Sequence, residues 1–122
     1  QKRINYMVHI KRLQEEGADI IHVIGEIDAS SSIELDLTIA KSVGEGHRKI
    51  LIDCHALEYI SSAGLGVFMS YIDEFKEKKI QMVLFGMQER VANTFSILGL
   101  ADLLNIRQTK GEAKQLADEL SV

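Results

Sequence analysis

Two adjacent serines, Ser61 and Ser62, are the residues best placed to do chemistry in this chain. A buried apolar run ends at Asp53, a loop follows, and the serines stand directly before the clearest amphipathic helix pattern. A hydroxyl at a helix start can cap the helix, and a phosphate attached to it would lie near the positive end of the helix dipole. Ser62 is therefore a candidate phosphoacceptor, and the alternative is that it only caps the helix.

Two glycines, Gly64 and Gly66, fall inside the first turn of this predicted helix. Each costs about 1 kcal/mol of helix stability relative to alanine, so a purely structural helix would not favour them. Because glycine has no side chain, another protein or a nucleotide could approach the backbone closely here. We therefore expect a functional surface around Ser61, Ser62, and the residues Ala63, Gly64, Leu65 and Gly66 that follow.

Two acidic residues are further candidates. Asp28 follows an apolar β-branched run and either contacts a partner or caps the helix after it. Asp53 closes a short apolar strand and is interpreted as a structural acid at the strand end. Ser61 is interpreted as a hydrogen-bonding loop residue rather than a second phosphoacceptor.

Other chemistries find little support in the sequence. A serine hydrolase elbow needs Gly-x-Ser-x-Gly around Ser62, but position 60 is Ile60. Gly44-Glu45-Gly46 lacks the Lys-Ser/Thr ending of a phosphate-binding loop. With a single cysteine, Cys54, and no His-x-x-x-His spacing, a zinc site is not expected. We predict a protein that is not an enzyme and that has no cofactor or metal.

Alternating strand and helix patterns surround these residues. Strands are predicted around 4–10, 20–24, 50–52, 80–85 and 104–106, the first two joined by a turn at 15–17. Helices are predicted over 62–79, 91–98 and 113–120, and also over 33–39, where Ser30, Ser31 and Ser32 offer N-caps. Strands that are apolar on both faces indicate a sheet covered by helices. The order predicts an α/β fold with a mostly parallel sheet after a first hairpin.

The composition agrees with one compact domain spanning 1–122. The chain has 122 residues, of which 46% are hydrophobic and 26% charged, which excludes disordered and collagen-like classes. It has no apolar run near the roughly 20 residues that span a bilayer, and no basic-then-apolar segment opens it. A net charge of −4 argues against nucleic-acid binding. We therefore expect a cytoplasmic protein with no nucleic-acid partner and no membrane insertion.

Several motifs in order resemble the STAS domains of the anti-sigma factor antagonist family, over essentially the whole chain. They are Gly25-Glu26-Ile27-Asp28, Ile50-Leu51-Ile52-Asp53, Ser61-Ser62-Ala63-Gly64-Leu65-Gly66, and the segment Val91 to Leu100 with its Gly99-Leu100 turn. The resemblance implies a STAS fold, with a mixed, mostly parallel five-stranded sheet packed with about four helices.

The resemblance also implies a function in bacterial transcription regulation. An anti-sigma serine kinase, using ATP and magnesium, would phosphorylate the serine two positions before Gly64-Leu65, which is Ser62. The unphosphorylated protein would bind the kinase and release its sigma factor, and a PP2C-type phosphatase would reset the switch. Asp28 matches an acid of the family pattern, expected near the serine loop.

The sequence departs from that pattern at one position. Family members carry Asp before the phosphorylated serine, whereas this chain carries Ser61. The alternative is therefore a non-switching STAS scaffold or transporter-accessory module in a larger assembly. A small enzyme or nucleotide-binding protein is the third hypothesis.

Overall fold

The computed structural model describes residues 8–120. The strands are β1 (Val8–Glu15), β2 (Ala18–Ile27), β3 (Lys49–Asp53), β4 (Leu57–Ile60), β5 (Gln81–Phe85) and β6 (Asn105–Arg107). The helices are α1 (Ser32–Gly44), α2 (Ser62–Ser70), α3 (Ile72–Lys78), α4 (Glu89–Ile97), a 3₁₀ turn η1 (Leu100–Asp102), and α5 (Lys110–Leu120). The predicted α/β class is confirmed; of the predicted first strand, residues 4–7 lie outside the described range.

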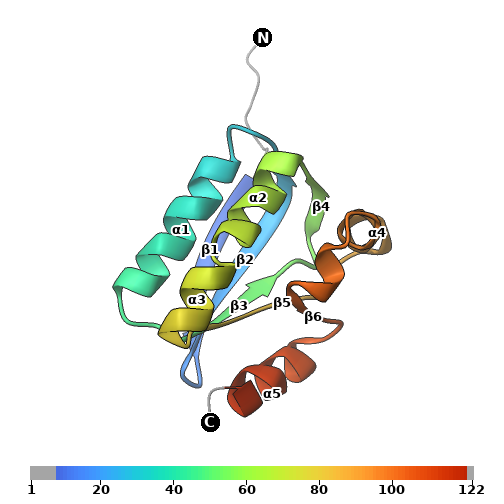
Figure 1. The fold of residues 1–122 in the computed structure, drawn as a ribbon. Helices are drawn as coiled ribbons and strands as arrows, with labels where there is room; N and C mark the ends of the chain where they lie inside the picture. Colours follow the sequence, from blue (N-terminus) through green and yellow to red (C-terminus); the bar gives the residue numbers. More distant parts are fainter. Residues whose placement is uncertain (1–7, 121–122) are drawn as a thin grey trace.

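The sheet is mixed and mostly parallel, as expected. Its strands lie in the order β1-β2-β3-β5-β6; β1 is antiparallel to β2, and the other pairs along this path are parallel. The five predicted strands form this path, but the described sheet has a sixth strand, β4, which also pairs with β2. Residues 57–60 belong to the segment that the sequence predicts to be a loop. β4 continues the line of β3 along β2 after a turn at 54–56 and leads directly into the two serines (Figure 1).

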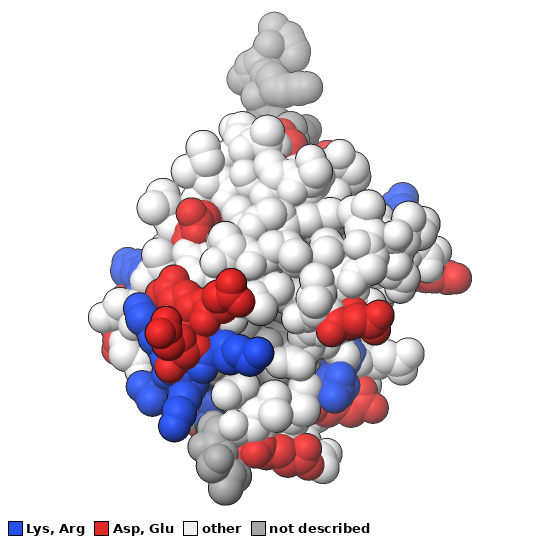
Figure 2. Space-filling model, in the orientation of Figure 1, with Lys and Arg blue, Asp and Glu red and all other residues white. Residues whose placement is uncertain are grey.

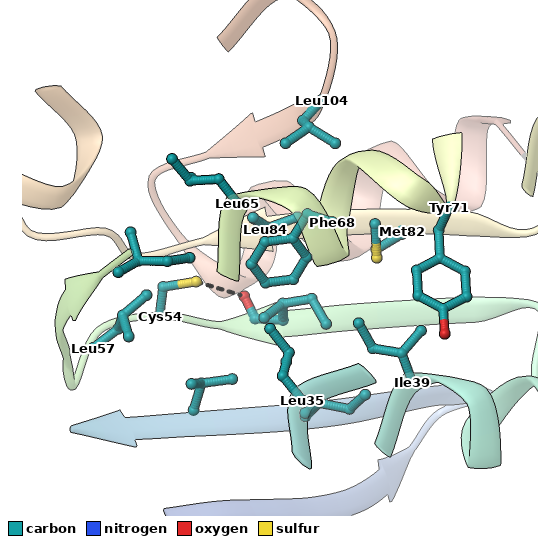
Figure 3. Packing of buried hydrophobic residues seen from close by; sticks show 14 of the residues in the cluster. Leu35, Ile39, Cys54, Leu57, Leu65, Phe68, Tyr71, Met82, Leu84 and Leu104 are labelled. Carbon is teal, nitrogen blue, oxygen red and sulfur yellow. Dashed lines mark hydrogen bonds between the residues drawn. The ribbon is translucent and has the colours of Figure 1, made fainter. Parts of the chain in front are cut away.

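Helices cover the two faces of the sheet unequally (Figure 1). Helices α1 to α4 pack over one face on the larger apolar core, to which α1 contributes Leu35 and Ile39 and α2 contributes Leu65 and Phe68 (Figure 3). On the other face, Ala113 and Ala117 of α5 pack on a smaller cluster. Cys54 is fully buried in the larger core, and burial raises the pKa of its thiol, so it is a core residue as interpreted.

The predicted long helix over 62–79 is broken at Tyr71, which separates α2 from α3. The Tyr71 hydroxyl donates a hydrogen bond of 2.5 Å to Oδ1 of Asp36 on α1. Tyr71 is 8% exposed and stacks against Phe75 with ring centroids 4.9 Å apart. The apolar periodicity continues through the break, because Phe68 and Phe75 both face the core, and this is why the sequence pattern indicated one helix.

A buried polar network ties the first hairpin to α1. Asp19 is fully buried, and its carboxylate accepts hydrogen bonds from Arg12 Nε at 2.8 Å, Gln14 Nε2 at 2.9 Å and Ser42 Oγ at 2.5 Å. Arg12 also contacts Glu45 at 2.7 Å. Burial alone would raise the pKa of Asp19, but the hydrogen bonds from Arg12, Ser42 and Gln14 outweigh it and hold the pKa below its usual value.

Candidate functional site

The two serines have different positions at the start of α2. Ser61 is the N-cap, and its hydroxyl accepts a hydrogen bond from the backbone N–H of Gly64 at 3.3 Å. Ser62 is the first residue of the helix, is exposed, and makes no side-chain hydrogen bond with another of residues 8–120. The capping role considered for Ser62 therefore belongs to Ser61. The hydroxyl of Ser62 is free to face a partner.

The two glycines of this helix also differ. A Cβ at Gly64 would lie 2.7 Å from Cγ1 of Ile60 and 2.8 Å from Cγ2 of Ile27. A Cβ at Gly66 would meet nothing within 4 Å, and Gly66 is exposed. The interpretation of Gly64 as a bare surface for a partner is wrong, because Gly64 lets α2 pack closely on β2 and β4. Leu65 is also buried, at 5% exposure, so among the predicted residues of this turn Ser62, Ala63 and Gly66 supply the surface.

The Asp28 loop lies beside the serine loop. The backbone N–H of Ser61 donates to the carbonyl of Ile27 at 2.8 Å, which places Ser61 next to the residue before Asp28. Asp28 closes the turn before α1: its Oδ1 accepts from the N–H of Ser31 at 2.8 Å and from the Ser31 hydroxyl at 2.9 Å. These hydrogen bonds, from the Ser31 backbone first and its hydroxyl second, hold the pKa of Asp28 below its usual value. Asp28 thus stabilises the turn before α1, whose N-cap is Ser31 and not Asp28. The half-buried carboxylate of Asp28 remains charged beside the serine loop.

The surface around Ser62 carries few charges. Helix α2 contains no acidic or basic residue from Ser62 to Ser70. In Figure 2 the upper part of the face formed by α1 and α2 is mostly uncharged, and acidic and basic groups gather lower down, near α3. Ile33 and Leu37 of α1 are 63% and 65% exposed. A new negative charge on Ser62 would therefore change the potential of this face strongly.

Sequence reasoning missed these two exposed apolar residues of α1. Ile33 and Leu37 alternate with polar residues, and that alternation made the segment resemble a strand. Their spacing of four residues could have identified them, because it places both on one side of a helix. The opposite side holds the buried Leu35 and Ile39.

Asp53 has the structural role predicted for it and joins two histidines. Its Oδ2 lies 2.9 Å from Nδ1 of His22, and its Oδ1 lies 2.8 Å from Nδ1 of His55. The backbone N–H of His55 donates to the same Oδ1 at 3.0 Å. Burial would raise the pKa of Asp53, but the hydrogen bonds from His55 and His22 outweigh burial and hold the pKa below its usual value. The carboxylate therefore holds the turn between β3 and β4 that leads to the serines.

Replacing Asp53 with asparagine should remove an acid-sensitive contribution to stability. A depressed carboxyl pKa contributes stability above the unfolded value of about 3.9 and loses it as the pH falls through the folded pKa. We expect Asp53→Asn to cost about 1 kcal/mol near neutral pH and less below about pH 4. Urea unfolding at a series of pH values measures this difference, and a cost that does not shrink on acidification would contradict it.

Within residues 8–120, neither a metal site nor a serine–histidine pair lies at the serines. Among residues 8–120, no group of three or more His, Cys, Asp or Glu side chains is arranged to hold a metal ion. No histidine within that range hydrogen-bonds to Ser62, and His22 and His55 are both engaged with Asp53. A hollow of about 820 Å³ lies between α4, β6 and α5, and neither serine lines it. In the same part of the chain no helix is long and apolar enough to cross a membrane.

The fold and the site together define a small mixed α/β domain, in which a strand–turn–strand element presents a serine at the start of a helix. The chain belongs to the STAS domain family, whose model matches residues 9–113. It is 33% identical over 110 residues to an anti-sigma-B factor antagonist of Listeria monocytogenes, covering 89% of this chain and 95% of that protein.

Solved structures share the fold. An anti-sigma factor antagonist from Mycobacterium paratuberculosis superposes with a TM-score of 0.80 at 19% identity, covering 91% of this chain and 94% of that one. The phosphorylated form of the Bacillus cell fate determinant SpoIIAA superposes with a TM-score of 0.65 at 17% identity, covering 89% of this chain and 97% of that one.

Proposed function

We propose that this protein is a cytoplasmic anti-sigma factor antagonist, controlled by phosphorylation of Ser62. It binds an anti-sigma serine kinase and thereby releases a sigma factor. The observation that carries the proposal is the free, exposed hydroxyl of Ser62 at the start of an uncharged helix. The curated relatives named anti-sigma-B factor antagonist support the same role.

The switch acts through charge and shape. A phosphate adds about −1.5 to −2 charges at neutral pH, and here it would stand on a helix that has no charged side chain. The positive end of the α2 dipole tolerates the phosphate, so the domain keeps its fold. A partner surface that buries Ser62, Ala63 and Gly66 must instead desolvate the phosphate, which weakens the complex. A PP2C-type phosphatase restores binding.

Asp28 supplies the acidic group of this surface. Family members place an acid immediately before the phosphorylated serine, but Ser61 occupies that position here and serves as the helix cap. The hydrogen bond from Ser61 N–H to Ile27 carbonyl holds the Asp28 loop beside the serines. We infer that the kinase contacts Asp28, whose loop this hydrogen bond joins to the serine loop.

Incubation with the anti-sigma serine kinase of the same cell, ATP and magnesium should place one phosphate on Ser62, located by mass spectrometry. We expect phosphorylation or Ser62→Asp to weaken kinase binding at least about tenfold, measured by calorimetry, because a charge must be desolvated. Ser70→Asp is the matched control, since Ser70 is also exposed but lies at the opposite end of α2. A phosphate that persists in Ser62→Ala would refute the site, and equal binding by Ser62→Asp would refute the switch.

Ser61 itself favours a second candidate, a STAS module without a switch that acts as a scaffold or transporter accessory in a larger assembly. The acidic residue that family members carry before the phosphoacceptor is absent here, so a kinase would find one negative charge fewer beside Ser62. A pull-down from the native cytoplasm separates the two functions. Recovery of a sigma-regulating kinase supports the switch, whereas recovery of a membrane ATPase without the kinase supports the scaffold.

A further inference from the structure

The strand β1 forms an unpaired edge of the described sheet. It pairs with β2 over its whole length, from Val8 to Glu15, without a bulge, and no described strand lies on its other side. Helix α5 packs mainly against β3, β5 and β6 and reaches β1 only at its last residue, Glu15, through Lys110 and Lys114. Leu13 on this strand is 56% exposed. An edge of this length presents main-chain donors and acceptors that another strand can use.

The hairpin turn determines which main-chain groups face outward. Glu15 pairs with Ala18 across the two-residue turn of Glu16 and Gly17, both with positive φ, as in a type I′ turn. In such a hairpin the closing pair exchanges both hydrogen bonds, so the N–H and C=O groups of Glu15 and Leu13 point to β2. Those of Gln14 and Arg12 therefore point to the free edge.

The side chains of β1 are complementary to the same strand running in the opposite direction. An antiparallel pair centred on Leu13 sets Leu13 against Leu13 and Lys11 against Glu15, the latter twice because of the two-fold symmetry. This register also uses the outward groups of Arg12 and Gln14, giving about four main-chain hydrogen bonds. A register centred on Arg12 would oppose two arginines, and one centred on Lys11 would oppose two lysines.

The two charged residues of these pairs differ: Lys11 is open, whereas Glu15 is already engaged by α5 and would receive Lys11 of a second copy as an additional cation. Lys11 is exposed and forms no ion pair with another of residues 8–120. Glu15 lies 2.7 Å from Lys110 and 3.9 Å from Lys114, and Lys114 also contacts Glu16. Arg12 projects to the opposite face, where it is held by Asp19 and Glu45, so it does not compete for Glu15 of a second copy.

We propose that β1 is a self-association edge, through which a second copy of this chain joins the sheet as an antiparallel β1–β1 pair centred on Leu13. The interface is small, because it consists of one strand from each copy, so the dimer is weak. We expect a dissociation constant on the order of 0.1–1 mM. The edge is formed by a strand other than those that present Ser62, so association does not require the proposed switch.

Charge reversal tests the register directly. Lys11→Glu and Glu15→Lys each replace two attractive pairs with two repulsive ones, and each variant alone should dimerise at least about tenfold more weakly than the wild type. An equimolar mixture of the two variants restores both attractive pairs, and it should form heterodimers with near wild-type affinity. Sedimentation equilibrium over a concentration series measures the dimer dissociation constant of the two variants and of their mixture. Circular dichroism shows whether each variant is folded.

Amide hydrogen exchange supplies an independent readout. The N–H groups of Arg12 and Gln14 should become protected as the wild-type concentration rises, while the Ser62 region does not change. Self-association is refuted by a wild-type chain that remains monomeric up to about 1 mM. A dimer that neither charge reversal weakens, or a mixture that fails to associate, refutes this register.

Discussion

Replacing Arg12 with methionine should lower the free energy of unfolding by about 3 kcal/mol, because it leaves the buried carboxylate of Asp19 without its cation. Asp19 has no exposed surface, and Arg12 approaches it at 2.6 Å. The hydrogen bonds from Gln14 and Ser42 remain and keep the loss below that of a completely isolated charge. Urea denaturation of the purified variant measures the change.

The pH dependence identifies the cause of this loss. In the wild type the depressed pKa of Asp19 contributes stability above the unfolded value of about 3.9, and this contribution disappears as the pH falls through the folded pKa. The difference between wild type and Arg12→Met should therefore shrink as the pH falls below about 4. A difference independent of pH would indicate lost packing of the arginine stem instead.

Two controls make the Arg12 prediction specific. Arg107 is an exposed arginine whose guanidinium donates a hydrogen bond to the carbonyl of its neighbour Ile106. Arg107→Met should change stability by no more than about 0.5 kcal/mol. The double variant Arg12→Met/Asp19→Asn should be more stable than the sum of the single losses predicts, since asparagine carries no charge to bury. Strict additivity would contradict the proposed pairing.

The sequence predicted elements whose signals are local. The segment 33–39 alternates like a strand, yet the polar residues before it indicated a helix. The structure has the helix α1 here, and hydrogen bonds between Asp28 and Ser31 stabilise the turn before it. β4 was missed because its four residues show no alternation: Leu57 and Ile60 are buried, and Glu58 and Tyr59 between them are exposed. A strand this short is defined by its pairing with β2, which a single sequence does not reveal.

The site segment could be predicted from the sequence, but the residue that caps α2 could not. The sequence offered Ser62 as the cap or the phosphoacceptor, whereas the position where the helix starts makes Ser61 the cap and leaves the Ser62 hydroxyl exposed. The buried network around Asp19 was not foreseen, because Arg12 and Ser42 come from different elements and meet only in the folded chain. Long-range contacts of this kind leave no periodicity in the sequence.

Gly64 is the clearest case of such a contact, and it leads to the second large effect. Gly64→Ala should destabilise the fold by about 1–3 kcal/mol, because the new methyl group would overlap side chains in a packed core. Its Cβ would lie 2.7 Å from Ile60 and 2.8 Å from Ile27, so α2 must shift away from β2 and β4. Thermal or urea unfolding measures the loss, and kinase binding should weaken as the start of α2 moves.

Gly66→Ala is the matched control, two residues along the same helix. Nothing lies within 4 Å of a Cβ at Gly66, so the higher helix propensity of alanine should stabilise the protein by about 0.5–1 kcal/mol. A loss of stability at Gly64 and a gain at Gly66 would separate the effect of close packing from the effect of helix propensity. Ile60→Ala should make Gly64→Ala less costly than it is in the wild type, because it removes the atoms that the new methyl group meets. Equal changes in stability at the two glycines would contradict the conclusion that α2 packs closely on β4 because Gly64 has no side chain.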